Sequence, residues 1–429
     1  MTNRLLLVTV ILLPLGFFSI KAFGVELTFF RLFLIPLTIS FFIHLFFLKK
    51  FERIVAKVLS NEVIIYILIY IGFSLMMLFY TFLSYENNLS FVRGVNTFVA
   101  HFSYLLLFPI IATSFLLFKP RKKFLFNLSY WWYVLLLWGL GQAAFYVLFD
   151  LSLAPEELLN FNDQNYFKIA GFNMIRINSF FGEPRNYAGM ILPIIFFYRY
   201  TKGCQKLVKQ DYVIVFLTGL LTGSVTFVLV ISLIIGVIFL LNSTLSQKKY
   251  LFLAGTFIVL STVTLAPEIE RFSLYLTAFE NKSFYFDSDL YNQASDWMSI
   301  IYLWDVLNGS HGFFNAIFGN GLGSFNNVIN EYYIDWFGVD LLESNYVVNS
   351  RLIIFNILVE LGLLGVFLFF YIFLKIYFLV AKRVLNNHML NNALIGFFVG
   401  SIMSGTYVFV ALYAIALFLI INDNYEDTD

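Results

Sequence analysis

Arginines and carboxylates that stand where apolar segments begin are the residues of this chain best suited to chemistry. The stretch from Arg176 to Ala188 reads Arg-Ile-Asn-Ser-Phe-Phe-Gly-Glu-Pro-Arg-Asn-Tyr-Ala and leads into an apolar run. Charges such as Arg176, Glu183 and Arg185 are costly at a membrane boundary unless they are paired or face water. Two interpretations are open: snorkelling side chains with a local Glu183–Arg185 pair, or an anion site, because arginine offers planar, bidentate contacts to phosphate.

A second set of charges lies nearer the C-terminus. Arg351 begins another apolar run, and Glu360 follows nine residues later, about two and a half helical turns into it. A carboxylate within a membrane is a functional candidate, with a structural pair or hydrogen bond as the alternative. Arg271 completes the set of arginines, and Glu343 is one of several carboxylates between Arg271 and Arg351. Each of these loop carboxylates is more often solvated than catalytic.

The segment from Gly319 to Ser324, Gly-Asn-Gly-Leu-Gly-Ser, is similar to a glycine-rich phosphate loop but lacks the Lys-Ser/Thr ending of a nucleotide-binding loop. Its glycines, Gly321 and Gly323 among them, could equally provide a turn. The four histidines have no metal-ligand spacing; they are His44, His101, His311 and His388. We therefore predict no metal site and no cofactor.

Composition indicates the elements that must position these residues. The chain has 429 residues, of which 60% are hydrophobic and only 12% charged, with a mean hydropathy of +0.82. This charged share is about half that of soluble proteins. The net charge of +1 gives no reason to expect a nucleic-acid partner, and the single Cys204 excludes an internal disulfide framework. We predict an all-α integral membrane protein, with residues 1–429 forming one polytopic membrane domain.

The apolar runs predict about twelve membrane-spanning helices, since one span needs roughly 20 apolar residues. Eight runs have the length of one span: 5–20, 28–48, 62–83, 95–118, 124–149, 180–198, 249–266 and 351–380. Two longer runs, 212–242 and 391–421, are interrupted at Thr222-Gly223-Ser224 and Ser404-Gly405-Thr406. We interpret each as a tight hairpin of two short helices, because small residues allow close backbone packing.

Orientation follows from the lysines and arginines of the short loops, which favour the cytoplasmic side. These residues cluster near 49–57, 119–123, 199–209, 248–249 and 382–383. All five clusters fall on one side when 212–242 crosses twice, and both termini are then cytoplasmic. Residues 150–179 and a large loop at 267–350 lie on the opposite face. The large loop is too rich in aromatic residues for a disordered linker, so we expect it to fold as short helices against the membrane.

Three stretches resemble motifs of the O-antigen polymerase and O-antigen ligase superfamily, the Wzy-like proteins of bacterial surface polysaccharide assembly. Arg176 to Ala188 is similar to the family's Arg followed by Ser-Phe-x-x-Glu-Pro and a small residue ahead of a helix. Ile317 to Phe325 is similar to its Phe-Gly-x-Gly-x-Gly-x-Phe segment, and Leu358 to Gly365 to its Glu-x-Gly-x-x-Gly helix. The order, the spacing and the twelve-span topology also agree.

The resemblance implies a metal-independent, C-type glycosyltransferase in the bacterial inner membrane. Its substrate would be an oligosaccharide repeat unit linked to undecaprenyl diphosphate, polymerised on the periplasmic face, where the 267–350 loop would lie. Arginines would stabilise the leaving diphosphate, and a carboxylate would act as base toward the acceptor hydroxyl. The catalytic candidates are Glu183, Arg176 and Arg351; the substrate-binding candidates are Arg185, Arg271, Glu343, Gly321 and Gly323. Membrane lipid and a chain-length regulator protein are candidate partners.

Departures from the family pattern favour a polymerase. A ligase is expected to carry a His-Asn pair where this chain has Arg351 and Leu352. The alternatives are an O-antigen ligase, a flippase or transporter for the lipid-linked oligosaccharide, or a non-catalytic scaffold. Flippases tend to have internal repeats and charges in their central helices, whereas the charges of this chain gather in outer loops.

Overall fold

A computed structural model gives the fold of this protein. The residues that it describes are 62–85, 90–98, 123–149, 184–222, 225–242, 288–310, 312–343, 352–384 and 388–404, short pieces at 19–22, 25–28, 36–40, 166–169 and 172–175, and the single positions 8, 11, 43, 177, 179, 348 and 350. They form two compact units. Unit 1 comprises Met1–Ile71, Val99–Ser232 and Leu368–Asp429, and unit 2 comprises Gly72–Phe98 and Leu233–Phe367.

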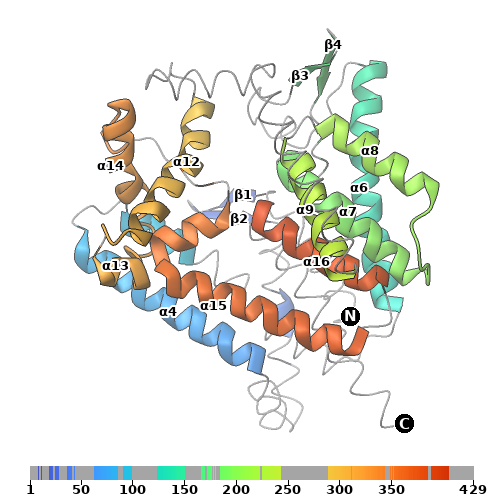
Figure 1. Ribbon diagram of the computed structural model, residues 1–429. Helices are drawn as coiled ribbons and strands as arrows, with labels where there is room; N and C mark the ends of the chain where they lie inside the picture. The colour runs from blue at the N-terminus through green and yellow to red at the C-terminus, as the bar shows by residue number, and fades with distance from the viewer. Residues whose placement is uncertain are drawn as a thin grey trace. The chain divides into compact units, whose positions relative to one another are not determined.

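Helices dominate the described residues (Figure 1). They are α4 (Glu62–Ser84), α6 (Lys123–Phe149), α7 (Pro184–Thr201), α8 (Lys209–Thr222), α9 (Val225–Asn242), α12 (Ser288–Leu307), α13 (Phe313–Phe318), α14 (Phe325–Phe337), α15 (Ile353–Val384) and α16 (His388–Ser404). Residues 90–98 are also helical. The sequence prediction of a helical protein is therefore right in its main feature.

Two antiparallel hairpins depart from the predicted all-α class. Strands β1 (Ser19–Ala22) and β2 (Val25–Thr28) pair with each other, as do β3 (Tyr166–Ile169) and β4 (Phe172–Ile175). Each strand has four residues, which is too short for an alternating pattern to be recognised in the sequence. The first hairpin overlaps the ends of the predicted spans 5–20 and 28–48, so the helix prediction is wrong at Ser19, Ile20 and Thr28; the second lies within 150–179, where no regular structure was predicted.

Among the described residues, three helices are long and apolar enough to cross a membrane: Ile64–Ser84, Lys123–Phe149 and Ile353–Ile372. The first two confirm, as helices, the predicted runs 62–83 and 124–149. The third lies within the predicted run 351–380, but the backbone is not helical at Gly362. The runs 5–20, 28–48 and 95–118 lie largely, and 249–266 wholly, outside the described residues. The twelve-span topology therefore stays a prediction.

The predicted interruption of the 212–242 run is confirmed as a boundary between two helices. Helix α8 ends at Thr222 and α9 begins at Val225. The two helices touch, because a Cβ placed on Gly219 would collide with the ring of Phe227. Helix α16 ends at Ser404, where the second long run was predicted to break; the rest of that run lies outside the described residues.

Helix α7 is the centre of unit 1 and contacts α6, α8 and α16. The rings of Trp132 on α6, Phe197 on α7 and Phe397 on α16 form a cluster with centroid separations of 5.9, 5.8 and 6.3 Å. All three side chains are fully buried. This cluster joins helices that are distant in sequence, so α7 is fixed along much of its length.

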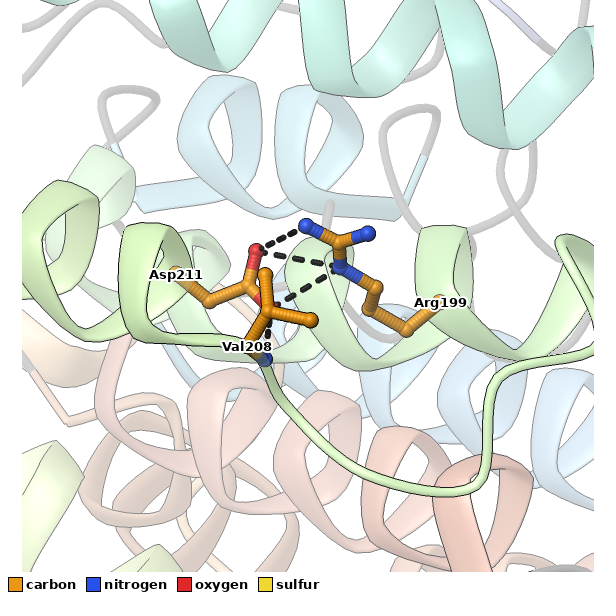
Figure 2. Close-up of polar contacts among 3 residues, drawn as sticks. All are labelled: Arg199, Val208 and Asp211. Atoms are coloured by element: carbon orange, nitrogen blue, oxygen red, sulfur yellow. Dashed lines mark hydrogen bonds and ion pairs between the residues drawn. The ribbon is translucent and has the colours of Figure 1, made fainter.

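An ion pair fixes the turn between α7 and α8 (Figure 2). The Arg199 guanidinium donates to the Asp211 carboxylate from Nε at 2.8 Å and from Nη2 at 2.8 Å. The same carboxylate accepts the backbone N–H of Val208 at 2.9 Å, just before α8 begins. Asp211 is fully buried and the Arg199 side chain is only 13% exposed. A planar, charge-assisted pair of this kind is stronger than an exposed ion pair.

We predict that Asp211→Ala lowers the free energy of unfolding by about 3 kcal/mol, because it leaves a buried guanidinium without its partner. The measurement is thermal unfolding of the full chain in detergent. Lys375→Ala is the matched control, since the Lys375–Glu62 pair is exposed and also lies in unit 1. Equal melting temperatures for Asp211→Ala and the control would show that the buried pair does not stabilise unit 1.

Candidate functional site

All three predicted catalytic residues fall outside the described part of the chain, namely Arg176, Glu183 and Arg351, and so does Arg271, predicted to bind substrate. Arg185 lies in the first turn of α7, and its side chain is likewise not described. Glu343 is exposed, and its backbone N–H donates to Asp340. Gly321 and Gly323 are buried in unit 2. The roles assigned to the arginines and to Glu183 therefore stay predictions.

Two residues of the motif that begins at Arg176 are fixed in unit 1. Ile177 is fully buried, and its N–H donates to the carbonyl of Leu221 at the end of α8, at 3.1 Å. Ser179 is also fully buried and has a φ of 51°. Gln142 on α6 accepts the Ser179 N–H at 2.9 Å, and its amide nitrogen lies 3.4 Å from the Ser179 carbonyl oxygen. The serine hydroxyl donates to the carbonyl of Leu135.

These contacts give Ser179 of the motif a structural role. A positive φ in a residue other than glycine is strained and persists only where its surroundings fix it. Gln142 and the Leu135 carbonyl satisfy every polar group of Ser179. The backbone next to Arg176 is thereby tied to both α6 and α8.

In unit 2 the glycine-rich segment is the meeting point of three parts of the chain. A Cβ on Gly323 would collide with the backbone of Ser90 and Gly94, and a Cβ on Gly321 with Thr81 of α4. A Cβ on Gly319 would collide with the backbone of α15 at Glu360 and Gly362. We call Gly94, Gly319, Gly321, Gly323 and Gly362 the glycine clasp. Backbone approaches backbone at Gly94, Gly319, Gly323 and Gly362, and the Thr81 hydroxyl approaches Gly321, so glycine fits best at these positions.

The break in α15 explains how the clasp is held together. Gly362 has φ 65° and ψ −168°, a conformation almost restricted to glycine. A helix that stops there leaves its last carbonyls without donors from the next turn. Val359 O accepts the N–H of Asn320 at 3.0 Å, and Glu360 O accepts the N–H of Gly321 at 3.1 Å. The glycine segment thus supplies donors that the continued helix would have supplied.

The Glu360 side chain completes this arrangement. Its carboxylate is buried and accepts hydrogen bonds from the backbone N–H groups of Gly323 and Phe325. Phe325 is the first residue of α14, so the Glu360 carboxyl group accepts an N–H of the first turn, which has no partner within that helix. Of the two alternatives that the sequence left open for Glu360, the structure provides the structural hydrogen bond.

The N–H groups of the glycine segment are all engaged within the protein. Gly319 donates to Asn315 O at 2.9 Å, Leu322 to Met77 O at 3.3 Å and Ser324 to Gly321 O at 3.2 Å. With the four donors already described, every N–H from 319 to 325 has a partner. A phosphate loop needs free N–H groups that converge on the anion. In this conformation the N–H groups of Gly321 and Gly323 are engaged within the protein, and the substrate-binding role assigned to these glycines stays a prediction.

A polar network extends from the clasp to α12 and α14. The Asn320 amide donates to the Tyr302 hydroxyl at 2.8 Å and to Val359 O at 3.0 Å. Burial raises the pKa of Tyr302 to about 12. The Tyr332 hydroxyl donates to the Asp305 carboxylate at 2.9 Å, and burial together with this carboxylate raises the pKa of Tyr332. Both tyrosines therefore stay protonated at neutral pH; the Tyr302 hydroxyl accepts a hydrogen bond from Asn320, and the Tyr332 hydroxyl donates one to Asp305.

The comparisons with known proteins identify no relative of this chain. No protein-family model matches the chain, and the search among curated proteins finds no match. The family resemblance therefore depends on the three motifs. Within the described residues, no three His, Cys, Asp or Glu side chains gather in a way that could hold a metal ion.

Sequence reasoning missed two residues that the structure makes prominent. Gln142 lies within a uniformly apolar run, and a polar residue there was a signal that it has a specific partner. Arg93 stands two residues before the predicted span 95–118 and was not singled out from other boundary charges. Its nitrogen Nη1 is buried and makes no hydrogen bond within the described structure.

We predict that Gly323→Ala destabilises the protein, because alanine at a φ of +91° costs about 1–3 kcal/mol even before its collision with Ser90 and Gly94. Thermal unfolding of the full chain in detergent measures the loss. Gly72→Ala, in helix α4, is the matched control. A Cβ at Gly72 would meet no atom of another part of the chain within 4 Å, and alanine is a better helix former than glycine, so that variant should be at least as stable as the parent. A parent-like melting temperature for Gly323→Ala would contradict the close packing of the clasp.

Proposed function

We propose that this chain is a membrane glycosyltransferase of the O-antigen polymerase and ligase type. It polymerises oligosaccharide repeat units linked to undecaprenyl diphosphate on the periplasmic face of the bacterial inner membrane. The product is a surface polysaccharide. The protein is multi-pass, with both termini cytoplasmic and residues 267–350 on the periplasmic side.

One observation carries the proposal: two of the three motif segments, about 40 residues apart in sequence, are one structural feature. Gly319 and Gly321 of the glycine motif bind the backbone and pack against the break of the Glu-x-Gly motif at Glu360 and Gly362. Motifs matched by chance have no reason to be in contact. Their mutual hydrogen bonding is expected if both belong to one inherited architecture.

The helical, strongly apolar character of the chain also supports the proposal. Three helices are suited in length and composition to a membrane. The segment proposed as the periplasmic loop contains α12, α13 and α14, and the buried residues of α12 and α14 form a core with the first part of α15. A substrate with a polyprenyl tail and a polar saccharide requires such a combination of membrane helices and an ordered polar face.

The proposed reaction transfers the growing chain as a block. The acceptor hydroxyl of a new lipid-linked unit attacks the anomeric carbon of the donor, and the bond between that carbon and the diphosphate oxygen breaks. Undecaprenyl diphosphate leaves with its added negative charge stabilised by arginines, for which Arg176, Arg185, Arg271 and Arg351 are the candidates. Glu183 takes the proton of the acceptor hydroxyl, with Glu343 as the alternative base.

A ligase activity is less favoured, because Arg351 and Leu352 occupy the positions of the ligase His-Asn pair. The two activities differ in their products. A polymerase needs only lipid-linked repeat units and makes a ladder of longer lipid-linked chains. A ligase makes no ladder from these units and requires a second acceptor.

We predict that the purified full chain converts synthetic lipid-linked repeat units into a ladder of polymers, and that Arg176→Ala and Arg351→Ala each reduce it to a single unit. Loss of one bidentate contact to the leaving diphosphate should lower the rate by about 100-fold or more. Gel separation of the saccharides gives the readout.

Lys206→Ala is the control, because Lys206 is exposed in the turn after α7 and its loss removes the same charge. It should give parent-like ladders. Normal ladders from both arginine variants at normal protein level would reject the site assignment. Absence of a ladder from the parent chain, with an intact substrate, would reject the polymerase itself.

A further inference from the structure

Arg93 is the only lysine or arginine among the described residues of unit 2. The same residues include six acidic side chains that the structure describes: Asp305, Glu331, Asp335, Asp340, Glu343 and Glu360. An arginine with a purely structural role would be expected to pair with one of them. Arg93 makes no ion pair among the described residues, although its Nη1 is buried and lacks any hydrogen-bond acceptor there.

The position of Arg93 is fixed by its neighbours on the same short helix. Ser90 is 1% exposed, and its hydroxyl donates to the side-chain oxygen of Asn327 on α14 at 2.9 Å. Gly94 packs against Leu322 and Gly323. Residues three and four apart share one side of a helix, so Arg93 stands beside the face on which Ser90 and Gly94 pack against Leu322 and Gly323.

This environment is unfavourable for a guanidinium with no partner. Burial lowers the pKa of Arg93, and no neighbouring carboxylate opposes that effect. Arginine remains charged in proteins, so the charge is present and partly desolvated. A buried donor without an acceptor is destabilising. An anion that supplies the acceptor removes this penalty, and phosphate oxygens match the planar donor fork of arginine.

We propose that Arg93, held at the edge of the glycine clasp, binds a phosphate group of a lipid-borne anion. The proposal rests on the proposed function, in which the segment between the spans at 62–83 and 95–118 lies on the same side of the membrane as the 267–350 loop. The ligand there is the diphosphate of the undecaprenyl-linked substrate. The headgroup of an anionic phospholipid has the same chemistry, and the test separates the two sources.

The test measures binding of undecaprenyl diphosphate, and separately of phosphatidylglycerol, to the full chain in nanodiscs of zwitterionic lipid. Native mass spectrometry counts bound lipid on folded protein only. The parent, Arg93→Met and Arg93→Lys are compared, with Lys206→Met as the control for loss of one charge. We expect Arg93→Met to weaken undecaprenyl diphosphate binding at least 10-fold, Arg93→Lys to retain part of it, and the control to bind like the parent.

Unfolding without added lipid gives a second readout. Methionine removes the unpartnered charge while keeping most of the side-chain volume, so Arg93→Met should melt at the same temperature as the parent or higher. Parent-like binding of undecaprenyl diphosphate by Arg93→Met would overturn the site and leave the polymerase proposal intact. Binding by Arg93 of phosphatidylglycerol alone would keep the anion site and count against the polyprenyl substrate. A parent chain that binds neither lipid would overturn both.

Discussion

The structure of unit 2 depends on one constraint: backbone groups that lose their helical partners within an apolar environment must find others. An unpaired carbonyl or N–H in such surroundings costs several kcal/mol. The break at Gly362 creates this problem in α15, and Asn320 and Gly321 solve it by donating to Val359 and Glu360. The irregular segment and the broken helix therefore require each other. Neither would be stable in this form alone.

The same constraint explains the alternation of the Gly-x-Gly-x-Gly motif. The glycines at 319, 321 and 323 are the positions where another backbone or α4 comes too close for a Cβ. The residues that follow each glycine make their contacts through their side chains. Asn320 binds Tyr302 and Val359, Leu322 is fully buried, and the Ser324 hydroxyl donates to Gly321 at 2.6 Å. The pattern resembles a phosphate loop in composition but serves to join helices, which is why its composition alone misleads.

The sequence predicted well those features that depend on long apolar runs. Helices α4 and α6 begin and end within one or two residues of the predicted runs, and the boundary at 223–224 was marked by small polar residues. The break at Gly362 was missed, because Leu-Gly-Leu-Leu-Gly is compatible with a continuous helix in a membrane. Its cause lies about 40 residues away in the glycine segment, and a local sequence pattern does not reveal such a distant partner. Arg93 was missed for a similar reason: whether a boundary arginine is paired depends on tertiary contacts.

In unit 1 the same constraint holds for the motif that begins at Arg176. Ser179 takes a backbone conformation that few residues other than glycine adopt, and the amide of Gln142 on α6 satisfies its N–H and approaches its carbonyl. The motif that begins at Arg176 and the glycine motif thus both contain irregular backbone. The Glu-x-Gly motif contains the broken helix whose free carbonyls accept hydrogen bonds from the glycine motif. In each case the polar partner comes from a distant helix and not from solvent. Rigid irregular backbone next to an arginine favours binding of an anion, because less conformational entropy is lost when the complex forms. Within the described residues of unit 2, Arg93 meets this condition, because it directly precedes Gly94 of the glycine clasp.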